Sequence, residues 1–142
     1  MIVAIGSDHG GFELKEKIIK ILMAEGCTVA DVGCDSSASV DYPDFAERVC
    51  KTVIEGKTRY GILICGTGIG MSMAANKHRK IRAALCHDNY TARLSREHNN
   101  ANILCLGARV TGTGVAEDIV RIWLNTPFSR GRHLNRIEKF SD

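Results

Sequence analysis

"GILICGTGIGMSMAANK" occupies residues 61–77 and joins an apolar run, a glycine-rich turn and the start of a helical pattern. The apolar run ends on Cys65, and Gly66, Gly68 and Gly70 follow at alternate positions. Glycine costs conformational entropy, so three of them require backbone dihedrals that other residues avoid, or close packing against the main chain. A glycine-rich turn before a helix also presents backbone N–H groups that can bind an anion or an oxyanion.

Short apolar runs alternate with helical patterns over the rest of the chain in the same way. The expected strands are 2–7, 28–33, 61–65, 81–86 and 102–106, and the expected helices are 12–26, 45–55, 71–77, 89–98 and 113–125, with a further short helix within 130–140. This alternation predicts a five-stranded parallel sheet with helices on both faces. We therefore expect a single doubly wound, Rossmann-like α/β domain over residues 1–142, in which residues 128–142 form a C-terminal tail.

The ends of these elements carry further signals. Asp44 is expected to cap the helix over 45–55, and Gly26 and Gly56 are expected to end the helices that precede them. In doubly wound folds, ligands bind beyond the carboxyl ends of the strands. The loops of interest therefore begin at Ser7, Gly33, Cys65, Cys86 and Gly107.

Composition excludes several classes of protein. The chain has 142 residues, of which 44% are hydrophobic and 25% charged, and this balance is ordinary for a globular domain. A net charge of +3 is too small to indicate nucleic-acid binding, and no apolar run reaches the length of a membrane helix. The opening residues do not resemble a secretion signal, so we expect a cytoplasmic protein. The six cysteines lack CxxC spacing, so we expect reduced, mostly buried thiols and no metal site.

The spacing of the glycine turn leaves three interpretations open. The phosphate loop GxxxxGK followed by Ser or Thr is absent. The dinucleotide fingerprint GxGxxG is incomplete because Met71 occupies its third glycine position, although Asp88 has the spacing of the ribose-binding acid. A turn that binds an anion, a dinucleotide turn and a purely structural tight turn all remain possible on spacing alone.

Cys65 differs from the other cysteines in its position. A thiol at a strand end, beside backbone N–H groups and a helix N-terminus, is expected to have a lowered pKa. Cys65 is therefore a candidate nucleophile or general base, and Thr67 places a hydroxyl two residues later that can bond the sulfur or a substrate oxygen. Cys86 and Cys105 also lie near strand ends but lack following glycines, so we interpret both as core residues.

Histidines and arginines in three other segments suit proton transfer and phosphate binding. Asp8 and His9 follow the first strand, and His98 ends the helix over 89–98. An imidazole suits proton transfer near neutral pH, although a solvent-exposed histidine at a helix end is the structural alternative. Arg132 and Arg136 lie four residues apart, so a helix would direct both guanidinium groups to one side, where they match phosphate oxygens. A solvated C-terminal helix is the structural alternative for them.

Six segments together resemble the type B ribose-5-phosphate isomerases and their relatives that act on allose and galactose 6-phosphates. The segments are GSDHGGFELK (6–15), VDYPDFA (40–46), GILICGTGIGMSMAANK (61–77), IRAALC (81–86), SREHNNANILCLGARV (95–110) and GRHLNRI (131–137). They occur in the order of that family and span essentially the whole chain. Six segments in register are far more specific than one glycine turn.

The resemblance implies a cofactor-free aldose–ketose isomerase that acts on a small sugar phosphate. It also implies active sites shared between subunits of a homodimer or a dimer of dimers, and neither nucleic acid nor a membrane as partner. Cys65 corresponds to the base that moves a proton between C1 and C2, and His98, assisted by Asp8, to the group that opens the ring. Groups that hold the enediolate oxygens are Thr67 and the amides from Gly66 through Gly68 to Gly70. Phosphate ligands are His9, Arg109, Arg132 and Arg136, and sugar contacts are Tyr42 and Asn99.

Several functions remain to be separated. We expect interconversion of ribose 5-phosphate and ribulose 5-phosphate, with an aldohexose 6-phosphate such as allose or galactose 6-phosphate as the alternative substrate. A non-catalytic sugar-phosphate sensor would keep the arginines but would not need both Cys65 and His98. A nucleotide-binding oxidoreductase would require a complete dinucleotide fingerprint.

Overall fold

The computed structural model describes residues 1–141 and contains one parallel sheet of five strands. The strands are β1 (Ile2–Ser7), β2 (Thr28–Asp31), β3 (Tyr60–Cys65), β4 (Ala83–Leu85) and β5 (Ile103–Gly107), in the spatial order β2-β1-β3-β5-β4. The register places Ser7 beside Ile64 and Cys65 beside Gly107, so three central strands end at one level. We call this side the carboxyl end of the sheet and the opposite side its amino end.

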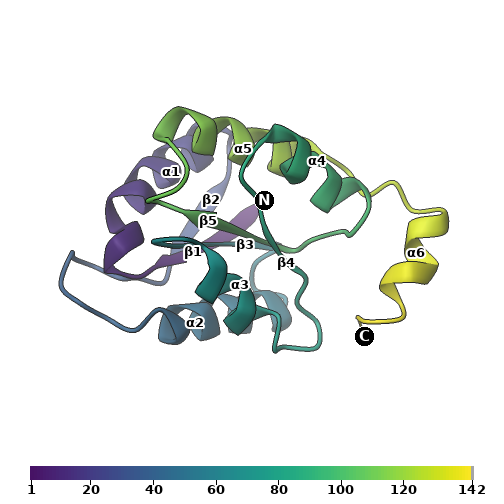
Figure 1. Cartoon of the computed structure of the whole chain (residues 1–142), viewed down its shortest axis with the longest axis horizontal. Helices are drawn as coiled ribbons and strands as arrows, with labels where there is room; N and C mark the ends of the chain where they lie inside the picture. Colours follow the sequence, from purple (N-terminus) through teal and green to yellow (C-terminus); the bar gives the residue numbers. More distant parts are fainter. Residues whose placement is uncertain (142) are drawn as a thin grey trace.

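Helices cover both faces of the sheet, as Figure 1 shows. The helices α1 (Phe12–Ala24), α4 (Asn89–Glu97) and α5 (Thr113–Asn125) lie on one face, and α2 (Tyr42–Ile54) and α3 (Ile69–Ala75) lie on the other. A short 3-10 helix, η1 (His9–Gly11), follows β1, and α6 (Arg132–Ile137) stands apart from the body of the domain at the end of the chain (Figure 1). This arrangement confirms the predicted doubly wound α/β class.

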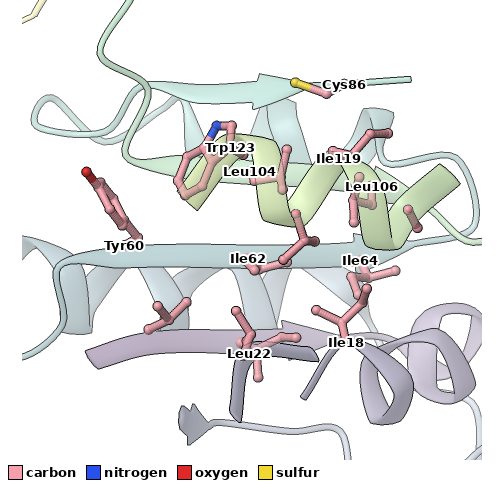
Figure 2. Packing of buried hydrophobic residues seen from close by; sticks show 14 of the residues in the cluster. Ile18, Leu22, Tyr60, Ile62, Ile64, Cys86, Leu104, Leu106, Ile119 and Trp123 are labelled. Carbon is pink, nitrogen blue, oxygen red and sulfur yellow. The ribbon is translucent and has the colours of Figure 1, made fainter. Parts of the chain in front are cut away.

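Two apolar clusters, one on each face of the sheet, form the core. Figure 2 shows the first, in which Ile18 and Leu22 of α1 and Trp123 of α5 pack around Ile62 and its neighbours in β3. The second cluster joins α2 and α3 to the opposite face of the same strands. All six residues of β3 are buried, which explains why this strand is apolar throughout rather than alternating.

Most expected elements occur near their predicted positions, with one wrong cap. The helix expected over 45–55 begins at Tyr42, because Pro43 suits the first turn of a helix, where its missing N–H has no partner to lose. Asp44 therefore lies inside the first turn instead of capping the helix. The predicted stops are confirmed, since Gly26 and Gly56 adopt left-handed φ values of +80° and +71° just beyond the helix ends.

The order of the strands locates the region where a ligand would bind. The chain connects β1 outward to β2 and then returns to β3 on the other side of β1, so the winding direction changes between β1 and β3. In open α/β sheets, ligands bind outside the carboxyl ends of the strands at such a switch point. The loops after Ser7 and Cys65 flank it. None of the helices within residues 1–141 has both the length and the apolar character to cross a membrane.

Candidate active site

Cys65 ends β3 at the switch point, and its thiol is held by the turn that follows. The side chain is only 5% exposed, and the Gly68 backbone N–H donates a hydrogen bond to Sγ over 3.2 Å. The Gly68 backbone is left-handed, with φ of +78°, a conformation that glycine adopts without steric cost. The turn thus folds back over the end of β3 and holds the sulfur atom in place.

The glycines of the turn are required by close packing. A Cβ on Gly68 would lie 2.5 Å from Leu85 Cδ1, and one on Gly70 would lie 2.6 Å from Tyr42 Cζ. The Tyr42 ring therefore rests directly on the turn, with its hydroxyl 2.9 Å from the same Gly70 position. This proximity brings together Tyr42, a predicted sugar contact, and Gly70, a predicted enediolate donor.

Arg109 lies over the beginning of the same turn. Its backbone N–H donates to the Gly66 carbonyl over 2.9 Å, which fixes the loop after β5 against the loop after β3. Its guanidinium group occupies the space that side chains on Gly66 and Gly10 would need, with Nη1 3.2 Å from the first Cβ position and Nη2 3.5 Å from the second. The structure thus holds a positive charge within a few ångströms of the turn.

Thr67 and Gly107 connect the turn to the neighbouring strand. The Thr67 hydroxyl accepts the Ile69 N–H over 3.2 Å, and this side chain is exposed at the surface of the turn. A Cβ on Gly107 would lie 2.5 Å from the Thr67 carbonyl oxygen, so β5 must end on glycine for the turn to cross it. Gly107 was predicted only as the start of a loop, because this requirement depends on the register between β3 and β5.

Asp8 and His9 are fixed by the first loop. Asp8 is buried, and its Oδ1 accepts the Gly11 N–H over 3.1 Å, so the carboxylate caps η1. His9 Nδ1 accepts the Val40 N–H over 3.2 Å, which leaves Nε2 as the protonated nitrogen of a neutral ring. Both residues lie at the carboxyl end of β1, beside the Cys65 turn. Eight predicted groups besides Cys65 are thereby assembled here: Asp8, His9, Tyr42, Thr67, Arg109, Gly66 and the other two turn glycines.

The remaining predicted residues lie at the amino end of the sheet. α4 starts after β4 at the carboxyl end and runs back across the face, so His98 and Asn99 come just before β5 begins. α5 runs back in the same sense, and its Trp123 contacts Tyr60, the first residue of β3, with ring centroids 4.9 Å apart. The chain then leads directly into α6, which carries the predicted phosphate ligands Arg132 and Arg136. One chain therefore does not bring His98 or these arginines to Cys65.

Within this second group, His98 packs against a residue that was not predicted to belong to the site. The rings of His98 and His133 stack with centroids 4.2 Å apart and planes 14° apart. Desolvation lowers the pKa of His133, and the nearby charges of His98, Arg132 and Arg136 lower it further. The position of His133 between two predicted phosphate ligands in GRHLNRI was the one available signal for it.

The structure does not support Asp88 as the ribose-binding acid of a dinucleotide site. The Asp88 side chain caps α4, where Oδ1 accepts the Thr91 N–H over 2.7 Å. The Thr91 hydrogen bonds lower the pKa of Asp88, which keeps the capping carboxylate ionised. Met71, at the position of the third glycine of the fingerprint, is fully buried. Both residues have local structural roles.

Three of the other cysteines, Cys50, Cys86 and Cys105, lie deep in the core. All six thiols are free and buried. Burial raises the pKa of Cys50 to about 12 and that of Cys86 to about 11, and it raises the pKa of Cys105 as well. A thiol with such a pKa stays protonated at neutral pH, so the prediction that Cys86 and Cys105 are core residues is confirmed.

These features define a class of α/β protein in which a thiol, an amide-rich turn and a guanidinium group meet at the switch point of a parallel sheet. Proteins that share this fold and sequence include sugar-phosphate isomerases. A family profile described as Ribose/Galactose Isomerase matches residues 3–140.

The chain belongs to the Ribose/Galactose Isomerase family, which confirms the resemblance found in its sequence. Ribose-5-phosphate isomerase B of Escherichia coli is 47% identical over 136 residues, which cover 96% of this chain and 91% of that protein. D-erythrulose-4-phosphate isomerase of Pectobacterium atrosepticum is 43% identical over 138 residues, covering 96% and 91%. A solved structure of Clostridium thermocellum ribose-5-phosphate isomerase B superposes with a TM-score of 0.97 at 52% identity, covering 98% of this chain and 94% of that one. The family and these relatives support sugar-phosphate isomerisation as the general activity.

Proposed function

We propose that the chain interconverts ribose 5-phosphate and ribulose 5-phosphate through an open-chain sugar and a cis-enediolate. The observation that carries the proposal is the Cys65 thiol at the switch point, which accepts the Gly68 N–H and lies in a turn covered by the Arg109 side chain. A base beside an amide-rich turn suits removal of a proton alpha to a carbonyl, because the charge that develops on oxygen requires donors already in place.

The proposed reaction has two proton-transfer stages. First, His98 transfers a proton from the anomeric hydroxyl to the ring oxygen, so that the C1–O bond of the ring breaks and the C1 aldehyde forms. Second, the Cys65 thiolate removes the C2 proton, the enediolate forms, and the same proton is returned to C1 while the O2 hydroxyl proton passes to O1, which leaves a ketone at C2 and a hydroxyl at C1. The first stage breaks the bond to the ring oxygen and the second moves a proton between two carbons, which is why two separate groups are needed.

The donors to the enediolate can be assigned by elimination within the turn. Two of its amides already have partners, since the Gly68 N–H donates to Cys65 Sγ and the Ile69 N–H donates to Thr67 Oγ1. We therefore assign the amides of Gly66, Thr67 and Gly70 to the enediolate oxygens. The Tyr42 hydroxyl beside Gly70 is placed to contact a sugar hydroxyl.

A complete site requires a second copy of the chain. Cys65 and the amino end of its own strand are separated by about 17 Å, the length of a six-residue strand, and His98 lies at that amino end. We propose a homodimer, alone or paired into a dimer of dimers, in which one copy supplies Cys65 and the other supplies His98, Arg132 and Arg136. On α3, next to the turn, Ile69 is 51% and Met73 68% exposed, and these apolar side chains are suited to an interface.

The names of two relatives bear on the substrate, because they give sugar phosphates of different lengths. The two named relatives act, according to their names, on a five-carbon and a four-carbon sugar phosphate. The reacting carbons therefore stay at the thiol while the distance to the phosphate ligands changes with the sugar. An aldohexose 6-phosphate needs a longer distance between Cys65 and the arginines of α6, and it remains the second candidate substrate.

The decisive experiment is a coupled isomerase assay with ribose 5-phosphate beside allose 6-phosphate. We expect turnover of the first to exceed that of the second, and we expect it to disappear in Cys65→Ala. Absence of turnover with either sugar, combined with binding of both, would establish a non-catalytic sensor instead.

Subunit complementation tests the shared site separately. Cys65→Ala and His98→Ala proteins should each be inactive, but after mixing and subunit exchange about a quarter of the activity should return. The fraction follows because half of the dimers are mixed and each mixed dimer contains one intact site. Failure to recover any activity after confirmed exchange would show that each site is formed within one chain.

A further inference from the structure

A basic cavity lies at the amino end of the sheet, away from the Cys65 turn. It has a volume of about 750 Å³ and is open to solvent, and we call it the arginine cavity. Its polar lining comprises Arg59, Arg82, Arg96, Arg130, Asn100, Asn102, Asn125 and Thr126. None of the residues assigned above to the isomerase reaction lines it. The cavity therefore needs an explanation of its own.

The four arginines of the cavity have no acidic partner within the described part of the chain. Ion pairs of arginine with carboxylates occur elsewhere, at Arg93 and Arg121, but none among residues 1–141 involves a cavity arginine. No aspartate or glutamate lines the cavity. Four positive charges thus converge on one concave surface without neutralisation, which is the electrostatic arrangement of an anion site.

Arg96 shows the cost of this arrangement most clearly. The side chain is 3% exposed, and its Nη groups donate to neutral oxygens of Tyr60, Asn100 and Ala101 over 2.6–2.9 Å. Its Nε is buried without a hydrogen-bond partner. Burial lowers the pKa of Arg96, and the positive charges of Arg59 and Arg82 lower it further. The rings of Tyr60 and Trp123 lie 4.8 and 5.5 Å from the guanidinium carbon and offset part of the burial cost. They carry no negative charge, so a bound anion would supply the counterion that this buried guanidinium group lacks.

The backbone around the cavity supports the same conclusion. Within residues 1–141, Asn100 and Arg130 are the two non-glycine residues with left-handed backbone, at φ of +46° and +60°, and both line the cavity. Asparagine adopts this conformation with little penalty, but for arginine it is uncommon and unfavourable. Unfavourable backbone conformations concentrate where function requires a particular side-chain direction.

We propose that the arginine cavity binds a phosphate group, as free phosphate or as a phosphate ester. Arginine forks match the geometry and the charge of phosphate oxygens, and the neighbouring asparagine amides can donate further hydrogen bonds. The volume exceeds that of phosphate alone, and Leu124, Pro127 and Phe128 form an apolar wall that can contact the organic part of an ester. A ligand here would contact two segments at once. One is the end of α4, next to His98, and the other is residues 126–130, which precede α6.

The test is a titration of the full-length ¹⁵N-labelled protein with inorganic phosphate at constant ionic strength, followed by NMR. The cross-peaks to follow are Arg96 Nε–H and the side-chain amides of Asn102 and Asn125. We expect saturable shifts, with a dissociation constant raised about tenfold or more in the double variant Arg59→Gln/Arg130→Gln. Adenosine 5′-monophosphate is titrated in parallel: tighter binding than phosphate assigns the apolar wall to an ester, and equal binding assigns the site to free phosphate.

Two control variants make the result specific. Arg93→Gln removes a charge from α4, the helix that also carries Arg96, at a position outside the cavity. It should leave the dissociation constant for phosphate unchanged. Arg136→Ala weakens the proposed substrate phosphate site, so the cavity shifts should survive it even if the isomerase proposal fails. Cavity shifts that persist in Arg59→Gln/Arg130→Gln, or that disappear only in Arg136→Ala, would overturn the proposal. Cross-peaks that change with protein concentration instead of phosphate would show that another copy of the chain covers the cavity, and would overturn it too.

Discussion

The two ends of the sheet carry two halves of the candidate site, and they are built in different ways. At the carboxyl end, Cys65 belongs to a fully buried strand, and the glycines of its turn are in close contact with neighbouring strands and rings. At the amino end, His98 lies at a helix terminus, and Arg132 and Arg136 are carried by a six-residue helix of which only Ile137 is buried. The first half is fixed by the core of its own chain, whereas the second has few contacts with that core.

This difference indicates which part of the reaction each half can perform. Proton transfer at carbon requires a base and oxyanion donors held to a fraction of an ångström, and a strand end in the core provides that precision. Binding of a phosphate group tolerates more movement, since long arginine side chains can follow it. Mutations at the rigid half should therefore lower kcat, and mutations of the arginines at the exposed half should mainly raise KM.

The largest effect is expected for Cys65→Ala. Removal of the general base should lower kcat by about 1,000-fold with little change in KM, as measured by steady-state kinetics with ribose 5-phosphate. Cys50→Ala is the matched control, because Cys50 is also fully buried on the same face but has no proposed role. It should lower the free energy of unfolding while leaving kcat within about twofold. Comparable losses of kcat in both variants would remove Cys65 from the mechanism.

Gly68→Ala should have the next largest effect. The new methyl group would meet Leu85 Cδ1 at 2.5 Å and the backbone of Leu106 at 2.9 Å, at a residue whose φ is +78°. We expect the free energy of unfolding to fall by about 3 kcal/mol, from overpacking together with left-handed strain. Chemical denaturation measures this change. Gly112→Ala, where a Cβ meets nothing within 4 Å, should change stability by less than about 1 kcal/mol. A Gly68→Ala protein as stable as Gly112→Ala would contradict the packing argument.

The sequence predicted the rigid half better than the exposed half, for physical reasons. The apolar run before Cys65 and the alternating glycines are local signals of a buried strand and a constrained turn, and the structure confirms both. The need for Gly107 depends on the register between β3 and β5, which pairs residues about 40 positions apart. The stacking of His133 on His98 depends on where the chain after α5 turns, and no local sequence pattern indicates the position of that turn. The misplaced cap at Asp44 shows that even a local signal fails when a proline shifts the helix start.

At the exposed half, Arg136→Ala should raise KM for ribose 5-phosphate by about tenfold, with a smaller change in kcat. The expected loss corresponds to one charge-assisted contact with phosphate, about 1.4 kcal/mol. Lys139→Ala, which removes an exposed charge just beyond α6, is the control and should leave KM unchanged. An unaltered KM in Arg136→Ala would exclude this arginine from the phosphate site. A tenfold fall in kcat at constant KM would show that the exposed half is as closely involved in the chemistry as the rigid half.

The smallest effect concerns the histidine pair. The pKa of His133 is lowered by desolvation and then by the charge of His98, so protonation is harder in the folded protein than in the unfolded chain. The folded state therefore binds fewer protons, and His133 should reduce stability as the pH falls below about 6.5, with no effect above it. His98→Phe keeps a stacked ring but removes its charge, so the pKa of His133 should rise toward its ordinary value. An NMR titration of the His133 ring protons measures the change. A pKa that does not move in His98→Phe would attribute the shift to desolvation and the arginines alone.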